Sequence, residues 1–440
     1  MQVEQRGPTP RPRVLVNQQR EEPVPEAKPY SIPKQLVMDA YQRVRQNRGA
    51  AGVDGESLAA FEKDLKGNLY KIWNRMSSGS YMPPPVKLVE IPKDDGRIRP
   101  LGVPTVADRV AQTVAKMVLE PLVEPIFHPD SYGYRPGRSA LDAVGTARQR
   151  CWDFDWVIDL DIVGFFDNLD WSLVGKAVAH HTDIPWLRLY IARWLRAPVQ
   201  RPDGTLEQRE KGSPQGAVIS PLLANLFLHY AFDVWMRRQF PSVPFERYAD
   251  DCAVHCKTEA EARSVLEAIR GRLAQCRLEL HPTKTRIIYC KDDDRPGEYE
   301  HVRFDFLGYT FQPRRAKNRW GKFFVSFLPA ISTKAAKKIC KTIRGWRLAA
   351  TRNNQQLDDL ARFINPIVRG WMNYYGRFYR SWCGLVLRHI NEALAAWVRR
   401  KFTRFRRKEQ ASAHWLWRVS RRDPNLFAHW QMGIRPDAEV

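Results

Sequence analysis

The chain has 440 residues, 44% of them hydrophobic, so it can bury more than one sizeable core and is not disordered as a whole. Its 71 lysines and arginines against 48 acids give a formal net charge of +23, which indicates a polyanionic partner, most simply nucleic acid. A membrane surface is the alternative. However, no lipidation signal is present and the most apolar window, residues 217–235, is interrupted by polar residues, so we expect no membrane partner. Seven cysteines without a C-x-x-C pair indicate reduced thiols in a cytoplasmic protein.

The first third of the chain predicts a tail, a helical segment and a β-hairpin. Residues 1–33 hold seven prolines and predict a disordered tail, and a helical pattern follows until the glycine-rich residues 47–55. Residues 86–91 and 97–103 flank an Asp-Gly turn and predict a hairpin that presents Lys93, Arg97 and Arg99. From spacing alone, these cations are equally well read as solvated charges.

A basic loop follows at residues 131–139. It contains Arg135 and Arg138 and leads into a helix that Ser139 and Asp142 are expected to cap. A basic loop at a helix amino terminus suits a phosphate, although a plain cap with two solvated arginines fits the pattern as well.

Residues 156–162 alternate between apolar and polar side chains, which predicts a strand. Trp156, Ile158, Leu160 and Ile162 form the expected buried side, whereas Val157, Asp159 and Asp161 face the other way. The two carboxylates then lie about 6 to 7 Å apart on one face. Downstream, residues 212–216 predict a loop, and Ser220-Pro221 predicts the start of a helix with one apolar face.

The central motif is Arg247-Tyr248-Ala249-Asp250-Asp251-Cys252, which lies between two apolar runs. This pattern predicts a strand, a tight turn and a second strand, so that both carboxylates project from one edge of a sheet. Two carboxylates held in this way are natural ligands for magnesium, whereas an isolated Asp-Asp is usually a polar surface turn. Thr258 and Glu261 then predict a capping box for the next helix.

Beyond about residue 326 the composition becomes helical, basic and aromatic, and seven of the ten residues 399–408 are basic. Phe402 and Phe405 lie among these cations, and Trp415 and Trp417 follow. Such a segment can contact phosphates and stack on unpaired bases. The alternative is a solvated helix with its aromatic side chains in a small core.

Together these motifs resemble a known family. Tyr248-Ala249-Asp250-Asp251 resembles the catalytic box of reverse transcriptases, and residues 369–376 resemble the thumb, or maturase, signature of enzymes encoded by bacterial group II introns. The resemblance covers roughly residues 40–430. No His/Asn cluster or paired C-x-x-C follows, so we expect the HNH endonuclease domain of many relatives to be lacking.

The resemblance implies an α+β right-hand polymerase fold with an α-helical thumb and a short basic C-terminal DNA-binding region. The expected divisions are a disordered tail (1–33), an N-terminal extension and fingers (34–130), a palm (131–325), a helical thumb or maturase domain X (326–395) and a basic nucleic-acid-binding region (396–440).

The resemblance also implies roles for individual residues. Asp161 and Asp250 would bridge two magnesium ions, or manganese, with Asp251 in support and Ile162 among the metal ligands. Asp159 is then expected to be a surface or ion-paired carboxylate. The residues implied in substrate binding are Lys93 and Arg99 at the triphosphate, Phe166 beneath the sugar, Gln215 beside nucleotide and template, and Lys284 near the departing pyrophosphate. Residues 304–309 resemble the hairpin that grips the primer end. The expected nucleic-acid contacts are Arg135, Arg138, Arg399, Arg400, Lys401, Arg404, Arg406 and Arg407.

The implied activity is RNA-directed DNA synthesis from deoxynucleoside triphosphates in the bacterial cytosol or nucleoid. The implied partners are an intron RNA, an RNA template with a DNA primer, and target DNA. One alternative is a protein that acts mainly as an RNA-binding splicing cofactor, and another is a host-adopted relative in defence or DNA repair. Ser213 and Ala217 depart mildly from the family pattern, which usually has threonine and glycine there.

Overall fold

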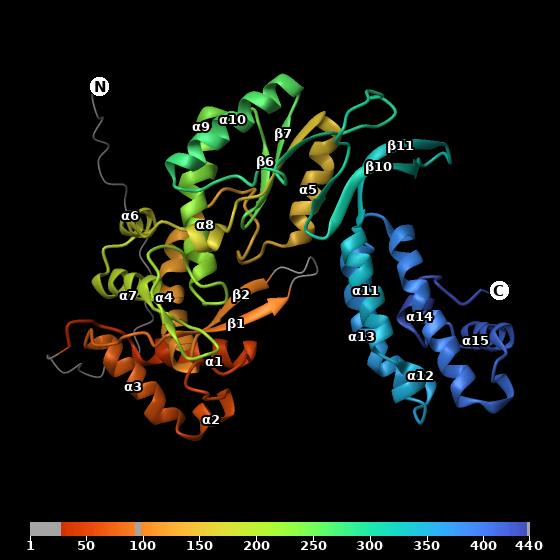
Figure 1. Cartoon of the computed structure of the whole chain (residues 1–440), viewed down its shortest axis with the longest axis horizontal. Helices are drawn as coiled ribbons and strands as arrows, with labels where there is room; N and C mark the ends of the chain where they lie inside the picture. Colours follow the sequence, from red (N-terminus) through yellow and green to blue (C-terminus); the bar gives the residue numbers. More distant parts are fainter. Residues whose placement is uncertain (1–27, 93–97, 438–440) are drawn as a thin grey trace.

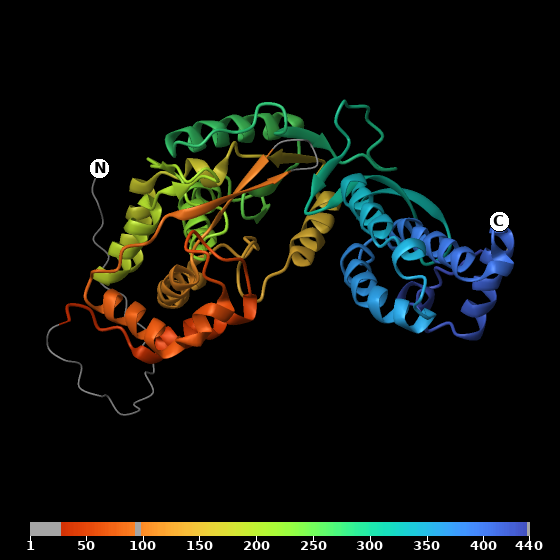
Figure 2. The same cartoon turned by 60° about the horizontal axis from the view of Figure 1, so that its bottom comes forward.

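The computed structural model describes residues 28–92 and 98–437, and within them the chain forms an α+β part followed by a helical part. Figures 1 and 2 show the first helices and the last helices at opposite ends of the molecule, with the strands between them. The expected fold class, an α+β right hand with a helical C-terminal region, is confirmed.

The amino-terminal part packs three helices on a longer one beside the predicted hairpin. Helices α1 (Lys34–Asn47), α2 (Leu58–Lys63) and α3 (Leu65–Ser77) lie near α4 (Val106–Val123). Strands β1 (Val86–Pro92) and β2 (Ile98–Val103) form the predicted antiparallel hairpin. They extend into a sheet with the short strands β4 (Val199–Gln200) and β5 (Leu206–Glu207). The tip of the hairpin, with Lys93 and Arg97, lies outside the described residues.

A four-stranded antiparallel sheet in the order β6-β7-β3-β8, called the central sheet below, forms the middle of the molecule. Its strands are β3 (Trp156–Leu160), β6 (Phe245–Tyr248), β7 (Asp251–Cys256) and β8 (Arg286–Tyr289). Helix α10 (Glu259–Gln275) covers one face, and α5 (Ala140–Asp153) covers the other together with a third sheet. Val157 is therefore fully buried, and the expectation that only one side of β3 is buried was wrong.

Further helices support the central sheet from behind. They are α6 (Trp171–His181), α7 (Pro185–Arg196), α8 (Ser220–Leu228), a π-helical turn at His229–Asp233, and α9 (Val234–Gln239). Helix α8 begins at Ser220-Pro221 as predicted, but it is buried on every side rather than along one face. None of the described helices combines the length and apolarity that crossing a bilayer requires.

Caps fix the helices that flank the site. Ser139 and Asp142 form the predicted capping box on α5. On α10 the Thr258 hydroxyl accepts the Glu261 N–H at 3.1 Å, but the Glu261 carboxylate accepts the N–H of Lys257 instead of closing the predicted box.

The third sheet connects the α+β part to the helices. It contains β9 (Phe304–Phe306), β10 (Tyr309–Lys317) and β11 (Phe323–Ile331), and β9 pairs only with the first three residues of β10. The helices that follow are α11 (Thr333–Gly345), α12 (Leu348–Thr351), α13 (Leu357–Tyr375), α14 (Arg380–Lys401), α15 (Glu409–Arg422) and α16 (Ala428–Gln431). They share one core, which includes Phe427 and Trp430, and the expected division between residues 395 and 396 lies inside α14.

Candidate active site

The pairing of β3 with β7 brings two of the predicted catalytic carboxylates together. Asp159 pairs with Ala253 and Leu160 with Cys252. Continuing this register by one residue sets Asp161 opposite Asp251, and side chains that oppose each other in this way start about 5 Å apart. Asp250 lies in the turn between β6 and β7, so all three acids gather at one edge of the central sheet.

A buried arginine holds this turn. Ala249 has a φ of 58°, a conformation that a residue with a side chain rarely adopts. The guanidinium of Arg247 donates to the Ala249 carbonyl at 3.0 Å and to both carboxylate oxygens of Asp233, at 2.8 and 2.6 Å. Arg247 is 1% exposed, so it acts as an internal brace. Sequence reasoning gave it no role, because the pattern does not reveal that Asp233 lies beside it.

The basic loop at residues 131–139 packs directly beneath the same turn. The Tyr132 N–H donates to the Arg247 carbonyl at 2.8 Å, and the amide of Asn225 donates to the Gly133 carbonyl at 2.6 Å. A Cβ on Gly133 would lie 2.4 Å from the backbone nitrogen of Ala249. Only glycine therefore permits this close approach.

The electrostatics of the carboxylate edge favour neutralisation. Burial, together with the charges of Asp250 and Asp161, raises the pKa of Asp251 to about 6. Burial also raises the pKa of Asp250, and the Asp161 charge adds to this effect. A cation that binds here relieves the repulsion among the carboxylates, which is the usual arrangement of a hard-cation site.

Asp159 differs from its expected role. Burial, followed by the charges of Asp251 and Asp161, raises its pKa to about 8, so its carboxyl is mostly protonated at neutral pH. Among the described residues it forms no ion pair, and it lies on the face where Val157 and Ala253 are buried. The expectation of a surface or ion-paired carboxylate was therefore wrong, because the second face of the sheet is covered.

A lysine contacts the edge directly. The Lys284 ammonium lies 2.6 Å from a carboxylate oxygen of Asp161, and both side chains are partly exposed. The segment that carries Lys284 is bonded to the end of β3, since His281 donates to the Asp161 carbonyl at 2.7 Å and the Thr285 hydroxyl contacts the Asp161 amide at 3.2 Å. Lys284 therefore lies at the acids themselves, within reach of any phosphate bound to them.

The donors at this edge fit magnesium as a partial ligand set. Nowhere in residues 28–92 and 98–437 do three or more His, Cys, Asp or Glu side chains lie so that they could hold a metal ion by themselves. Magnesium usually keeps several waters and binds one or two carboxylates plus substrate phosphates. Ile162, the other predicted metal ligand, has a largely buried side chain and is bridged to Leu280, so only its backbone carbonyl is a suitable donor.

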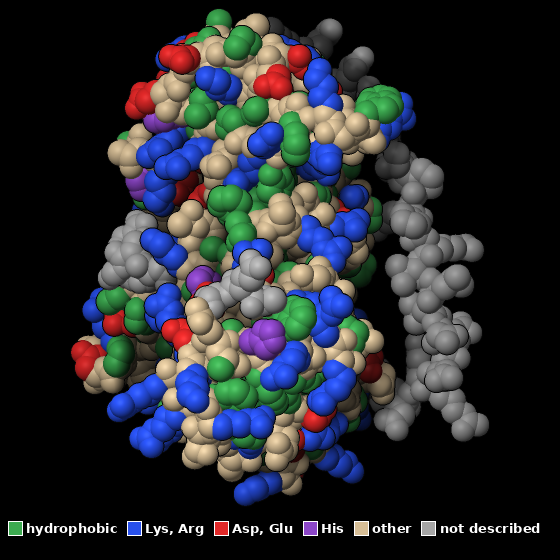
Figure 3. Space-filling view, turned by 90° about the vertical axis from the view of Figure 1, so that its right-hand side faces the viewer, with side chains coloured by type: hydrophobic (Ala, Val, Ile, Leu, Met, Phe, Trp, Pro, Cys, Tyr) green, Lys and Arg blue, Asp and Glu red, His purple; other side chains and the backbone are tan. Residues whose placement is uncertain are grey.

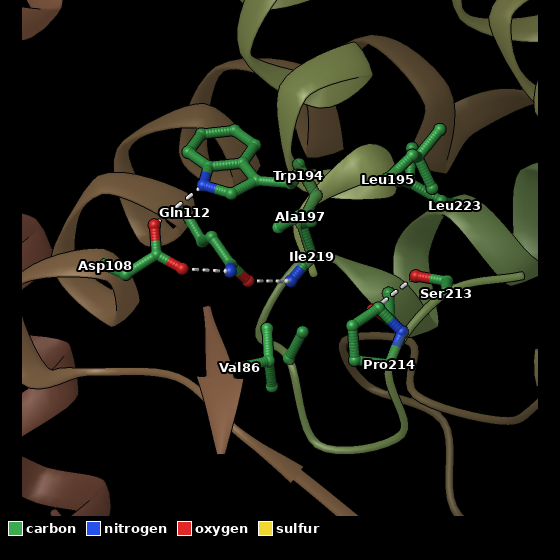
Figure 4. Close-up of a pocket in the computed structure, with 12 residues that line it drawn as sticks. Val86, Asp108, Gln112, Trp194, Leu195, Ala197, Ser213, Pro214, Ile219 and Leu223 are labelled. Atoms are coloured by element: carbon green, nitrogen blue, oxygen red, sulfur yellow. Dashed lines mark hydrogen bonds between the residues drawn. The ribbon is translucent and has the colours of Figure 1, made fainter. Parts of the chain in front are cut away.

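A network buried behind the site positions the loop at residues 212–219 (Figure 4). The side-chain oxygen of Gln112 on α4 accepts the N–H groups of Val218 and Ile219 at 2.8 and 3.3 Å. Its amide nitrogen donates to Asp108 at 2.9 Å. The cavity among these side chains has a volume of about 10 Å³, room for one water at most.

Asp108 anchors this network. It also accepts hydrogen bonds from Trp194 at 2.7 Å and Tyr81 at 2.9 Å, and burial raises its pKa to about 6.

The substrate residues predicted from the sequence lie around this frame. The Gln215 carbonyl accepts the Gly102 N–H at 2.6 Å, which joins the loop to the β1–β2 hairpin. Arg99 on that hairpin is exposed, and its charge acts on Asp250 and Asp251. Phe166 is 9% exposed and its neighbour Phe165 is 2% exposed, both in the short helix at Phe165–Asn168. Lys93, the remaining predicted triphosphate contact, falls outside the described residues.

Two predicted nucleic-acid contacts in and after the basic loop have different environments. Arg135 is bound inside the protein, with Glu124 at 2.8 Å and the carbonyls of His128 and Ser131 at 2.7 Å each. Its assignment as a nucleic-acid contact is corrected, because these groups occupy the guanidinium. Arg138 is exposed, and its role in nucleic-acid binding stays a prediction.

The basic segment at residues 399–408 divides in the same way. Lys401 donates to the Gln355 carbonyl at 2.6 Å, and Arg399 contacts Ser412 at 3.2 Å and Glu409 at 3.6 Å. Both side chains are partly exposed, so their roles as nucleic-acid contacts stay predictions. Phe402, Phe405 and Trp415 pack in or against the helical core, as the small-core alternative predicted. The exposed cations that remain are Arg400, Arg404, Arg406, Arg407 and Lys408.

Sequence reasoning missed a second basic surface, on α11. Its buried side is Ala335, Ile339 and Ile343, and every lysine and arginine of this helix is exposed. These cations are Lys334, Lys337, Lys338, Lys341 and Arg344. Figure 1 shows α11 on the side of the helical region that faces the rest of the molecule. Figure 3 views the molecule from the right-hand side of Figure 1, and on that face Lys and Arg side chains outnumber Asp and Glu. The lysines of this segment recur at a helical spacing, and this spacing was the sequence signal from which the basic surface could have been predicted.

Comparison with known proteins agrees with this geometry. Residues 91–311, half of the chain, match the family model described as reverse transcriptase (RNA-dependent DNA polymerase). The chain belongs to the reverse transcriptase family. Residues 335–420 match the group II intron, maturase-specific domain, so the resemblance to group II intron reverse transcriptase/maturases is confirmed. The first match spans the carboxylate edge, and the second spans α11 and most of the C-terminal helices.

The curated relatives of this chain differ in how much of their own length it matches. Protein YkfC of Escherichia coli (strain K12) is 31% identical over 318 residues, which cover 63% of this chain and 80% of YkfC. The group II intron-encoded protein LtrA of Lactococcus lactis subsp. cremoris is 33% identical over 209 residues, covering 46% of this chain and 33% of LtrA. The putative COX1/OXI3 intron 1 protein of Saccharomyces cerevisiae is 27% identical over 201 residues, 46% of this chain and 24% of that protein. The chain thus matches a third or less of the two intron-encoded relatives.

Proposed function

We propose that this protein is an RNA-directed DNA polymerase that joins a deoxynucleoside triphosphate to a primer 3′-hydroxyl on an RNA template. The observation that carries the proposal is the gathering of Asp161, Asp250 and Asp251 at one edge of the central sheet. Two strands and a braced turn bring these acids together, and the family model covers all of them.

The proposed chemistry uses the acids to hold cations and uses no side-chain nucleophile. Asp161, Asp250 and Asp251, with the Ile162 carbonyl, would hold two magnesium ions, or manganese. When bound, the ions would lower the pKa of the primer hydroxyl and neutralise the triphosphate. Asp250 and Asp251 would bind as carboxylates, since a nearby cation offsets the burial that raises the pKa of each.

Basic side chains near the acids have a matching role. Lys284 would leave Asp161 for a phosphate of the incoming nucleotide, which its partly exposed position permits. Arg99 would reach the same triphosphate from the β1–β2 hairpin. Gln215, whose loop is fixed by Gln112 and Gly102, would support the nucleotide from the opposite side.

The nucleic-acid path is proposed to run from this edge along α11. Its five exposed cations extend over eleven residues, or about 15 Å of helix, which is the spacing of several phosphates. None of the five forms an ion pair within the described residues, so each remains available to a polyanion.

A second function is favoured by the match of residues 335–420 to the maturase-specific domain. We propose that the helical region also binds intron RNA and promotes its splicing. The two functions use different surfaces, because catalysis needs the carboxylate edge and RNA binding needs the exposed cations. Binding to target DNA belongs to the same proposal, through the exposed cations at residues 400–408.

Primer extension on poly(rA)/oligo(dT) with magnesium tests the polymerase. Asp250→Asn should abolish extension while RNA affinity stays within a few-fold, since loss of a negative charge does not weaken attraction to phosphate. Asp183→Asn, at an exposed aspartate after α6, is the matched control and should extend normally. Extension that survives Asp250→Asn would refute the assignment of the site.

A further inference from the structure

One projecting element combines exposed aromatic side chains with unpaired cations outside the proposed active site. Beyond its first three residues, β10 pairs only with β11, so the outer part of this hairpin is a two-stranded ribbon. In Figure 1 it projects at the right of the molecule, above α14. Trp320 at its tip is 75% exposed, and Phe323 and Phe324 are 53% and 39% exposed. Three large rings exposed on one short ribbon are unusual unless a partner covers them.

The tip is held in a fixed shape. The side-chain oxygen of Asn318 accepts the N–H groups of Trp320 and Lys322 at 3.0 and 2.9 Å. Gly321 closes the turn with a φ of 87°, which favours glycine. The turn therefore holds the rings in place before any ligand binds, so binding would cost little conformational entropy of the hairpin.

Each of the two most exposed rings has a guanidinium beside it. The guanidinium carbon of Arg319 lies 4.0 Å from the centre of the Trp320 ring, and that of Arg315 lies 3.9 Å from the centre of the Phe323 ring. Since these rings are still more than half exposed, each keeps an open side. Lys317 also lies 5.6 Å from the centre of the Phe323 ring. An exposed ring with cations beside it suits a nucleotide, whose base can stack on the ring while the cations contact its phosphate.

The hairpin and the segment that follows it are strongly basic, which favours a polyanion with a high density of charge. The 52 residues between Asp305 and Asp358 contain twelve lysines and arginines and no acid. Arg315, Lys317, Arg319 and Lys322 form no ion pair within the described residues. Residues 292–294, which precede this stretch, are three aspartates, and one of them contacts the hairpin: Asp293 accepts the Val325 N–H at 2.9 Å. Trp382 at the start of α14 is 45% exposed and lies beside another cation of β10, with the Arg314 guanidinium 5.4 Å from the centre of its ring.

We infer that the β10–β11 hairpin is a binding site for single-stranded RNA, in which unpaired bases stack on Trp320 and Phe323 while Arg315 and Arg319 contact the flanking phosphates. Unpaired RNA is favoured over a duplex because paired bases do not expose their faces for stacking. RNA is favoured over DNA because the hairpin leads directly into the region that matches the maturase-specific domain. This site rests on the nucleic-acid partner of the proposed function, but it is separate from the carboxylate edge and requires neither metal nor nucleotide.

Fluorescence anisotropy with labelled 20-nucleotide oligo(U) at about 0.3 M salt, where the phosphate contribution is reduced, tests the inference. The double variant Trp320→Ala/Phe323→Ala should bind at least tenfold more weakly, with the slope of log K against log salt kept. Tyr70→Ala removes an aromatic ring of similar exposure, 56%, from α3 and should stay within twofold of the parent protein. The single variant Trp320→Tyr, which keeps an aromatic ring at this position, should retain most of the affinity of the parent protein.

The cations should behave differently from the rings. Arg315→Gln/Arg319→Gln should flatten the salt slope by about 1.4, from about 0.7 for each single-strand phosphate contact. Cross-linking of 4-thiouridine RNA should label the peptide that contains residues 318–324. Melting curves of all variants should match the parent, since the altered side chains are exposed.

Several outcomes would overturn the inference. These are equal affinities of the double variant and Tyr70→Ala, an equal loss on a 20-base-pair RNA duplex, tighter binding of oligo(dU) than of oligo(U), or cross-links only outside the hairpin. Asp250→Asn should bind oligo(U) like the parent. If the parent protein binds RNA through the hairpin but extends no primer, the proposed polymerase activity is refuted and the inferred RNA site on the hairpin is retained.

Discussion

At the scale of single residues, the candidate site depends on a few buried contacts that fix where the acids lie. The acids themselves are predictable, because Asp-Asp between two apolar runs and an Asp at the end of an alternating run place carboxylates at a sheet edge. The Arg247–Asp233 pair was not predictable, because its partners are 14 positions apart and meet only after a π-helical turn has formed. Asp159 was misassigned for a related reason, since its burial depends on α5 and the third sheet.

The Arg247 brace predicts a change in both stability and activity. Arg247→Lys keeps the charge but cannot contact both oxygens of Asp233 and the Ala249 carbonyl at once. We expect the free energy of unfolding to fall by about 3 kcal/mol, as for a broken buried ion pair, and primer extension to fall at least tenfold. Urea unfolding and extension assays measure these effects. Arg263→Lys, in an exposed pair with Glu259, is the control and should change neither.

Sugar selection tests the position of Phe166. We expect the ring to lie against C2′ of the nucleotide sugar, where a 2′-hydroxyl would lose water without a partner at a cost of about 1 to 3 kcal/mol. Phe166→Ala should therefore raise GTP incorporation relative to dGTP by about 10- to 100-fold in single-nucleotide kinetics. Phe165, the less exposed of the two rings, should leave the ratio unchanged when replaced by alanine. The reverse pattern would place the motif one residue out of register.

Asp108 predicts a pH dependence of stability. Burial raises the pKa of its carboxyl to about 6, above the value of 3.8 expected for the unfolded chain. A folded-state pKa that is raised in an acid favours folding at low pH, so this contribution is present below about pH 4 and is lost as the pH rises through 6. Between pH 5 and 7 the loss should be about 1 kcal/mol relative to Asp108→Asn, which does not titrate. Urea unfolding of both proteins across this range measures the difference, and parallel curves would contradict it.

At the scale of elements, local signals predicted several strands and helix starts. The Asp-Gly turn predicted the β1–β2 hairpin, Ser139 with Asp142 predicted the cap of α5, and Ser220-Pro221 predicted the start of α8. Patterns of exposure were harder to predict, because they depend on what packs against an element. Helix α8 is buried on all sides, and the aromatic rings at 402 and 405 turn inward although cations surround them in the sequence.

Two basic elements can be separated by the salt dependence of RNA binding. Lys337→Gln/Lys338→Gln/Lys341→Gln on α11 and Arg404→Gln/Arg406→Gln/Arg407→Gln each remove three exposed cations. If all three contact phosphates, each triple variant should flatten the slope of log K against log salt by about two to three units. Lys63→Gln/Lys66→Gln/Lys71→Gln on α2 and α3 removes the same charge from another surface and serves as the control. A slope equal to that of the control would mean that the element is a solvated face.

At the scale of the whole molecule, contacts of two tyrosines help to join the α+β part to the C-terminal helices. The Tyr374 hydroxyl on α13 donates to the Leu307 carbonyl at 2.8 Å, and Tyr309 on β10 donates to the Tyr374 carbonyl. Leu307 and Gly308 both have positive φ angles, of 51° and 81°, so this turn depends on its neighbours to hold its shape. The resemblance assigned this turn to the primer end, and the structure joins it to the C-terminal helices.

This junction predicts an effect on long products. Tyr374→Phe removes one hydrogen bond and should cost about 1 kcal/mol of stability. The turn at Leu307 should then hold the primer less firmly, so products should shorten on a long RNA template while the first nucleotide is added at the parent rate. Product lengths under single-encounter conditions measure this, with Tyr41→Phe on α1, whose hydroxyl donates to Glu62 at 2.6 Å, as the control.

Helix α14 also limits how this chain can exchange parts with its relatives. The helix runs without interruption from Arg380 to Lys401, and the segment after it returns Phe427 and Trp430 to the core that α11 and α13 help to build. A cut at residue 395 would therefore divide a helix and remove two fully buried rings, not release an independent basic module. Chimaeras that swap the C-terminal segment among reverse transcriptases should fold only when the junction lies before α11, so the helices and their basic surface are inherited as one unit.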